Sequence, residues 1–167
     1  AFMRCFVGFV TGQAALNQGF LESADQWFAE TESATRELSL PTARRISVAG
    51  RAAVAGQRGD TAAAAVHLEQ LEALQPDVCF MRVETEAGRA WALHCLGRVG
   101  AAREVLRAAV EWAIEADEPV EALLGLAEAC RLGDGKWAAD QIERVHGVEE
   151  IEGSLPSARS MLASSSR

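Results

Sequence analysis

The chain lacks tyrosine, has a single lysine, at Lys136, and has only 4 prolines among its 167 residues. Nucleic acids and anionic membranes are bound through clustered lysine and arginine side chains, so a net charge of −8 argues against both partners for this segment. Hydrophobic residues make up 49% of the chain, which together with the scarcity of proline excludes a disordered or collagen-like protein. We therefore expect a folded protein that makes no direct contact with nucleic acid.

The chain also lacks a C-x-x-C motif and a long apolar run. Its cysteines lie far apart in the sequence, at Cys5, Cys79, Cys95 and Cys130. This spacing is typical of reduced thiols and predicts a cytoplasmic location. The apolar segment at 1–10 is about half as long as a membrane span, is interrupted by Arg4 and has no A-x-A cleavage site. We interpret it as a buried helix and expect no membrane contact.

Alanine, by contrast, is abundant and clustered, as in 51–55 and 61–65, which favours helices over strands and predicts an all-α fold. One pattern recurs four times: a glycine, an alanine five positions later, and a bulky apolar residue four positions beyond the alanine. The four instances are Gly19/Ala24/Phe28, Gly59/Ala64/Leu68, Gly97/Ala102/Leu106 and Gly133/Ala138/Ile142. The glycines are 40, 38 and 36 residues apart, and this near-even spacing indicates a structural repeat.

The repeated pattern predicts a helix hairpin. The glycine is placed where a helix ends and the chain turns through a left-handed conformation, which glycine adopts at the lowest cost. The small alanine lies near the start of the second helix, where a larger side chain would hold the two helices apart, and the apolar residue fills the space one turn later. A hairpin cannot bury its apolar face alone, so neighbouring hairpins are expected to stack around a continuous core.

We predict a single domain over 1–167. Its repeats are expected at about 2–37, 42–74, 82–116 and 119–146, with the truncated start of a fifth at 154–163. First helices are predicted at about 2–17, 42–57, 82–96 and 119–131, and second helices at about 20–37, 60–74, 98–116 and 136–146. Pro41 and Pro119 lie at helix starts, where a missing N–H group costs nothing.

The repeat is similar to the tetratricopeptide repeat (TPR), a helix–turn–helix unit of about 34 residues. Besides the glycine, alanine and apolar residue, that unit has a small residue twelve positions before the alanine, and the first three repeats have Gly12, Ala52 and Ala90 there. The periods are longer than in TPRs. The sequence also departs from the TPR pattern at Thr31 and Leu71, where alanine is preferred, and at Arg51 and Arg89, where leucine is preferred. The resemblance implies TPR-like antiparallel helix hairpins stacked into a right-handed superhelix, an α-solenoid.

The sequence also resembles the helical region of large LuxR-family, MalT-like transcriptional regulators. The segments that carry this resemblance are 95–102 (CLGRVGAA), 103–110 (REVLRAAV) and 121–166. In that family a P-loop ATPase precedes the helical array and a helix-turn-helix follows it. The chain starts without methionine, and we expect it to be a piece of such a protein. The resemblance implies a sensing or protein-interaction domain, in which a ligand or partner shifts the regulator between an autoinhibited state and an ATP-bound one.

No catalytic residue, metal site or cofactor is predicted. Gly135-Lys136 is the one Gly-Lys pair, and Trp137 follows it where a P-loop needs Ser or Thr. The E-x-x-H at 143–146 has no second copy, as a di-iron bundle would require. His67-Leu68-Glu69 has no P-C-x-x-C element to complete a zinc deaminase site. An enzyme is therefore the last of the functions that we consider.

Binding residues are expected on the first helices, which line the concave face of a helical array. The candidates are Phe6, Phe9, Gln13, Asn17, Gln57, Trp91, His94 and Arg131. Their mix of aromatic rings, amides, one imidazole and one guanidinium suits a small effector or a protein partner. Two other interpretations are open: Phe6, Phe9 and Trp91 as plain core, and a scaffold or dimerisation module that senses nothing, so that a homodimer is a further candidate assembly.

Overall fold

The computed structural model describes residues 2–74 and 81–145, which are all-helical and contain no strand. Eight α-helices lie in this part of the chain, and a short 3-10 helix, Ile142–Arg144, follows the last of them. The α-helices are α1 (Phe2–Asn17), α2 (Leu21–Glu37), α3 (Pro41–Arg58), α4 (Thr61–Ala73), α5 (Arg82–Cys95), α6 (Val99–Glu115), α7 (Pro119–Arg131) and α8 (Gly135–Gln141). The predicted all-α class is confirmed for these residues, whereas the predicted helix start at 154–163 lies outside them.

The four repeated glycines end α1, α3, α5 and α7 in left-handed conformations, with φ between +72° and +80°. At Gly59 the amide donates to the carbonyl of Gly56 at 3.2 Å, and the following amide, of Asp60, donates to the carbonyl of Ala55 at 3.0 Å. These two bonds close the helix end and reverse the chain. The prediction that each glycine marks a turn within a hairpin is therefore confirmed.

Two turns between hairpins, at 38–40 and 116–118, use the same geometry without glycine. Ser39 and Asp117 adopt φ of +53° and +55°, each two residues before the proline that starts the next helix. The amide of Leu40 then donates to Thr35 at 3.0 Å, in the same pattern as at the glycine turns. Small polar residues tolerate the left-handed region better than other non-glycine residues, and without a glycine these turns are not marked in the repeat pattern.

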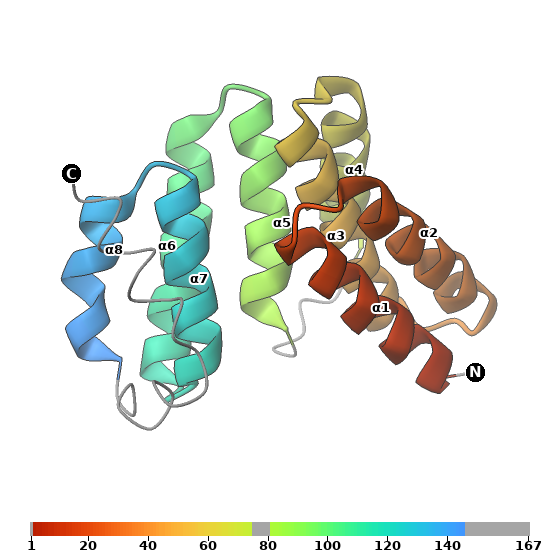
Figure 1. Ribbon diagram of the computed structural model, residues 1–167, viewed down its shortest axis with the longest axis horizontal. Helices are drawn as coiled ribbons and strands as arrows, with labels where there is room; N and C mark the ends of the chain where they lie inside the picture. The colour runs from red at the N-terminus through yellow and green to blue at the C-terminus, as the bar shows by residue number, and fades with distance from the viewer. Residues whose placement is uncertain (1, 75–80, 146–167) are drawn as a thin grey trace.

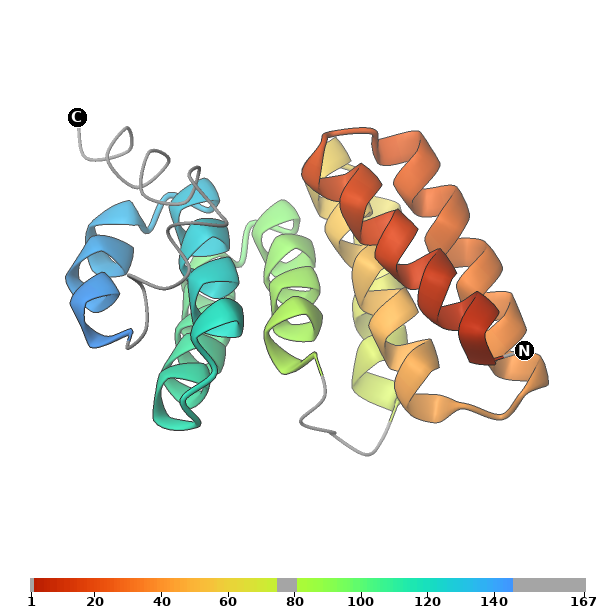
Figure 2. The same cartoon turned by 60° about the horizontal axis from the view of Figure 1, so that its bottom comes forward.

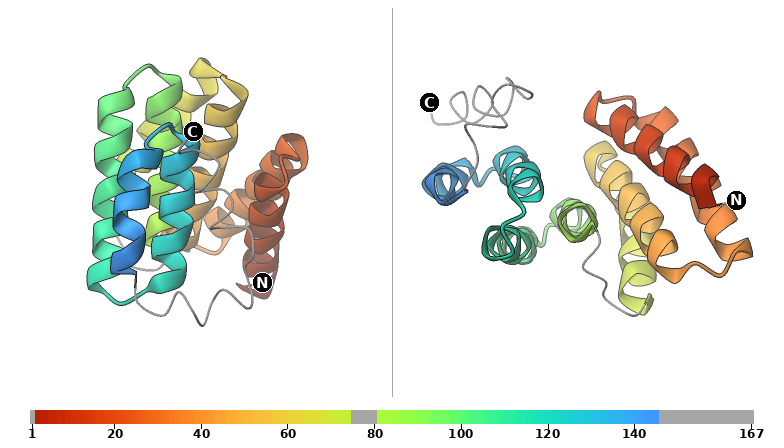
Figure 3. Two further views of the ribbon diagram at one scale, coloured as in Figure 1. Left: turned by 60° about the vertical axis from the view of Figure 1, so that its left-hand side comes forward. Right: turned by 90° about the horizontal axis from the view of Figure 1, so that it is seen from below.

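The hairpins pack in chain order, from α1 and α2 at one end of the molecule to α8 at the other (Figure 1). Each second helix packs against the next first helix, and α3 makes its most extensive packing with α5. Viewed from below, α5 to α8 appear nearly end-on while α1 to α4 are inclined (right panel of Figure 3). The direction of the hairpins therefore changes between α4 and α5.

The buried core follows the predicted pattern closely. The four repeat alanines, Ala24, Ala64, Ala102 and Ala138, are at most 1% exposed. The apolar residue one turn later is buried in the first three hairpins, at Phe28, Leu68 and Leu106. In the fourth hairpin Ile142 is only partly buried, because α8 ends at Gln141 and not at 146 as predicted.

The N-terminal helix corrects another expectation. We predicted a buried helix over 1–10, but α1 buries only one face, with Cys5 and Phe9 inward. Met3, Val7 and Val10 are 68%, 53% and 46% exposed, since α1 packs on α2 and α3 and has no neighbour among the described residues on its outer side (Figure 2). No described helix has both the length and the apolar character needed to cross a bilayer.

The tryptophans of the second helices also pack less uniformly than predicted. We expected Trp27, Trp112 and Trp137 to join successive repeats. Trp137 of α8 joins the fourth repeat to the third, because the guanidinium of Arg107 in α6 lies 5.1 Å from the centre of its ring. The ring of Trp112 instead lies 5.1 Å from Arg82 within its own hairpin, and Trp27 is exposed.

Candidate functional site

The odd-numbered helices form one layer of the molecule. Among the described residues, α1, α3, α5 and α7 pack against one another in order, and the even-numbered helices have no comparable packing among themselves. The eight predicted binding residues all lie on this layer, but the structure does not bring them into one site. It divides six of them between two hollows, and it leaves His94 and Arg131 outside both linings.

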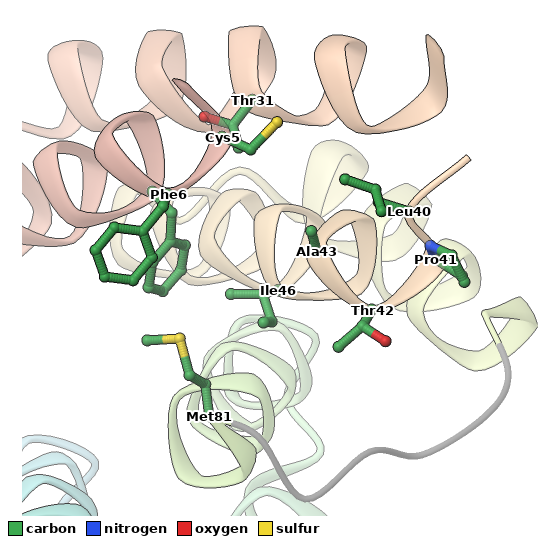
Figure 4. Close-up of a pocket in the computed structure, with 10 residues that line it drawn as sticks. Cys5, Phe6, Thr31, Leu40, Pro41, Thr42, Ala43, Ile46 and Met81 are labelled. Carbon is green, nitrogen blue, oxygen red and sulfur yellow. The ribbon is translucent and has the colours of Figure 1, made fainter. Parts of the chain in front are cut away.

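The first hollow, which we call the apolar hollow, has a volume of about 210 Å³. It is lined by Cys5, Phe6, Phe9, Thr31, Leu40, Pro41, Thr42, Ala43, Ile46 and Met81. The side chain of Met81 extends from the start of α5 toward Ile46 and Phe6 (Figure 4). Apolar and thioether groups dominate this lining, so its chemistry suits an apolar group of a ligand.

Two predicted residues, Phe6 and Phe9, contribute to the apolar hollow in different ways. Phe9 is 6% exposed, and its ring centroid lies 5.9 Å from that of Phe28, so it is chiefly a core residue. Phe6 is 48% exposed and free to meet a ligand. The core interpretation therefore fits Phe9, while the binding interpretation stays open for Phe6.

The second hollow, which we call the polar hollow, has a volume of about 80 Å³ and is lined from four helices. It contains four predicted residues, Gln13, Asn17, Gln57 and Trp91. Its other lining residues are Leu16, Gly50, Ala53, Val83, Glu84, Ala87, Gly88, Leu124 and Glu128. The candidates thus omitted both carboxylates of this hollow, Glu84 and Glu128.

A hydrogen-bonded network ties three helices together at the polar hollow. The Glu128 carboxylate accepts from the indole Nε1 of Trp91 at 2.7 Å and from Arg131 at 2.8 Å. Arg131 also donates to Gln57 at 2.9 Å, and its guanidinium lies 5.2 Å from the centre of the Trp91 ring. Because Glu128 is itself held by Arg131, and Arg131 by Gln57, the Trp91 side chain has a fixed position without a ligand.

His94 lies beside this network. Its ring packs edge-on against Trp91, with 6.2 Å between the ring centroids. The imidazole Nδ1 is buried and has no hydrogen-bond partner among the described residues. His94 therefore supports the position of Trp91 by packing, and does not itself line either hollow.

Glu84 has the least compensated carboxylate of the polar hollow. Its Oε2 atom is buried without a hydrogen-bond partner, and no described cation forms an ion pair with it. Burial raises the pKa of Glu84 above its ordinary value, and the nearby Glu121 carboxylate raises it further. The pKa of Glu121 is itself raised by burial, although its Oε2 accepts from the Val83 amide at 3.5 Å. The two helices α5 and α7 thus bring two carboxylates together, and neither forms an ion pair among the described residues.

This arrangement predicts a pH dependence of stability. A carboxyl group with a raised pKa binds protons more readily in the folded state, so stability falls as the pH rises above the ordinary value of 4.5. We expect Glu84→Gln to be more stable than the wild type at pH 7, with the difference vanishing near pH 4. Urea unfolding between about pH 4 and pH 8 measures this. Glu104→Gln, at an exposed position of α6, is the control. A Glu84→Gln protein less stable than wild type at pH 7 would contradict the expectation.

The two arginines that replace leucine in the TPR pattern are explained by ion pairs on the other side of the layer. Arg51 donates to Glu32 at 3.1 Å and to Asp25 at 3.1 Å, which ties α3 to α2. Arg89 lies 3.8 Å from Glu72 and 3.5 Å from Glu86, across α4 and α5. Glu32 is only 3% exposed, so these arginines serve packing between hairpins, not a binding site.

The other described histidine, His67, has a local partner. His67 is buried, and its Nδ1 lies 3.2 Å from the Gln70 side-chain oxygen. Burial lowers the pKa of His67. The hydrogen bond to Gln70 raises this pKa, whereas the nearby charge of Arg51 lowers it further. Over residues 2–74 and 81–145 no group of three or more His, Cys, Asp or Glu residues is placed to hold a metal ion. The E-x-x-H histidine, at 146, lies outside these ranges.

Comparison of the sequence with models of known protein families gives no match, and comparison with curated proteins gives none either. The odd-numbered layer and its two hollows are therefore the features of this chain that bear on its function.

Proposed function

We propose that this chain is a TPR-like, right-handed helical superhelix, and that it forms the sensing or protein-interaction region of a cytoplasmic LuxR-family regulator. A small effector or a partner protein binds to the odd-numbered layer and controls the regulator. The packing of α1, α3, α5 and α7 against one another supports the superhelix, since close inner helices and separated outer helices produce curvature. In a regulator of this kind, no step of catalysis by this chain is required.

The observation that carries the proposal is that two hollows of different polarity adjoin on that layer. Met81 lines the apolar hollow, and Val83 and Glu84 line the polar one, only two and three residues further along the chain. In α1, Phe9 lines the apolar hollow, and Gln13, one helical turn later, lines the polar hollow. A site with an apolar part and a few fixed polar groups is the usual composition of a ligand pocket.

An effector screen by thermal shift tests the proposal. A ligand that binds only the folded state stabilises it by about 2.7 kcal/mol at a hundred times its Kd. We expect compounds that raise the Tm of the wild type to lose this effect in Arg131→Gln or Phe6→Ser. The matched controls are Arg98→Gln and Phe20→Ser, two exposed positions at turns between helices. Compounds that act equally on all four variants would place the binding site elsewhere and contradict the proposal.

The alternative is a scaffold or dimerisation module that binds no effector. The exposed apolar face of α1, with Met3, Val7 and Val10, favours it, because such faces mark association surfaces. A screen in which no compound moves the Tm would favour this alternative.

For the regulator itself, the proposal requires a reading frame with a P-loop ATPase before this segment and a helix-turn-helix after it. A different setting would contradict the LuxR assignment.

A further inference from the structure

We propose that the polar hollow binds a primary ammonium group of the ligand, with the Glu84 carboxylate as its anionic anchor. This inference depends on the proposed binding function of the odd-numbered layer and specifies the chemistry that the layer recognises. It concerns the charged head group of a ligand, whether that group belongs to a free amine or to a lysine side chain.

The lining of the polar hollow is rich in hydrogen-bond acceptors from four helices. Side-chain oxygens are contributed by Gln13 and Asn17 of α1, Gln57 of α3, Glu84 of α5 and Glu128 of α7. The oxygens of Asn17, Gln57 and Glu128 already accept one hydrogen bond or more within the protein. An ammonium group has three donors and no acceptor, so it can donate to Glu84 and to further lone pairs of these oxygens. An anionic ligand would have to approach two carboxylates, and we therefore expect cations to be selected over anions.

The charges around the hollow leave Glu84 without a counter-ion. Arg131 is the cation next to the hollow, and its described polar contacts are with Glu128 and Gln57. Glu121 adds a second negative charge near Glu84. The charge of Glu128 is thus balanced within the protein, whereas that of Glu84 is not balanced by any described ion pair, and a bound cation would supply the missing partner.

The size of the hollow limits what it can hold. A volume of about 80 Å³ accommodates a small head group and not a whole drug-sized ligand. Trp91 lines the hollow with its indole fixed by Glu128, and aromatic rings attract cations, as does this ring with the Arg131 guanidinium 5.2 Å from its centre. The remainder of the ligand would extend along the layer, where the apolar hollow lies next to Met81.

An NMR titration with three probes tests the inference. The probes are n-butylammonium, n-butanol as its neutral counterpart, and N-acetyl-lysine N-methylamide as a lysine in a peptide. The readout is the indole N–H signal of Trp91, assigned by its loss in Trp91→Phe. We expect both cationic probes to shift this signal to saturation, and n-butanol to leave it unchanged.

The variant Glu84→Gln keeps the shape of the side chain and removes its charge. We expect it to weaken the binding of both cations about tenfold or more, the loss that accompanies removal of one charge-assisted contact. Glu104→Gln changes the net charge equally but lies on the exposed face of α6, and should leave the affinity unchanged. Equal affinities for wild type and Glu84→Gln would overturn the inference, as would an equal response to n-butanol. Circular dichroism melting of each variant confirms that it is folded.

The outcomes also separate this inference from the proposed function. Effectors that depend on Arg131 or Phe6, combined with no binding of either cation, would overturn the ammonium site and leave the binding module standing. Binding of n-butylammonium alone would identify free amines as the source, and tighter binding of the lysine derivative would identify a peptide. Either result supports the site at Glu84.

Discussion

Replacing Gly88 by alanine is expected to destabilise the protein by about 3 kcal/mol or more, the upper end of the range for an overpacked core. A Cβ atom at Gly88 would lie 2.2 Å from the carbonyl oxygen of Ala49 in α3. That neighbour is backbone and cannot rotate away, so α5 would have to move away from α3. The helix interface that would open is the most extensive one in the described molecule.

Gly100→Ala is the matched control for this prediction. Gly100 lies in α6, and a Cβ atom there would meet nothing within 4 Å. Because alanine restricts the unfolded chain, this variant should be more stable than wild type by about 0.4–1 kcal/mol. Urea unfolding of both variants measures the two effects. If Gly88→Ala were as stable as Gly100→Ala, the close approach of α3 and α5 would be wrong.

The helices were predictable because their ends are encoded locally. A glycine at each hairpin turn and an alanine five residues later fix the geometry through their own conformational and steric properties, without reference to the rest of the fold. Ser39 and Asp117 take the same left-handed conformation without glycine. These turns depend on the backbone strain that a small polar residue accepts at positive φ, and on the proline two residues later. We used the prolines only to predict where helices start.

The angle between hairpins was not predictable from the repeat pattern. Gly50 and Gly88 occupy equivalent positions, yet Gly50 faces the ring of Phe28 while Gly88 faces the backbone of α3. The residue equivalent to Phe28 in the next hairpin is the smaller Leu68. We infer that the large ring keeps α1 and α3 apart, whereas the smaller side chain lets α3 and α5 approach. Leu106 is the equivalent residue of the third hairpin, and α5 and α7 pack less extensively than α3 and α5, so the volume at this position does not by itself set the angle between hairpins.

The candidate site was only partly predictable for a related reason. Gln13, Asn17, Gln57 and Trp91 were identified because equivalent positions of first helices share a face. Glu84 shares that face but was not chosen as a candidate, and Glu128 was missed, because carboxylates on helices are usually solvated and a sequence does not report burial. Their roles depend on how α5 packs against α7, which local spacing does not determine.

The second large effect is expected at Phe28, which is fully buried between α1, α2 and α3. Cβ atoms at Gly12 and Gly50 would lie 2.8 and 2.6 Å from its ring, so the two glycines form the space that the ring fills. Truncation to alanine leaves a cavity that helix backbones cannot readily close. We expect Phe28→Ala to lower the free energy of unfolding by about 3–5 kcal/mol. Phe20→Ala, at a position 61% exposed, should change it little.

A double-mutant cycle separates the ring contact from a general loss of core. Gly50→Ala alone should be destabilising, since its Cβ would overlap the Phe28 ring. In the Phe28→Ala background that overlap is gone, and alanine is the better helix former, so the same substitution should be neutral or stabilising there. The expected coupling is therefore about 1–3 kcal/mol, measured by urea unfolding of the four proteins. Additive effects would show that Gly50 is small for some reason other than the ring, and the explanation given above for the separation of α1 and α3 would then be wrong.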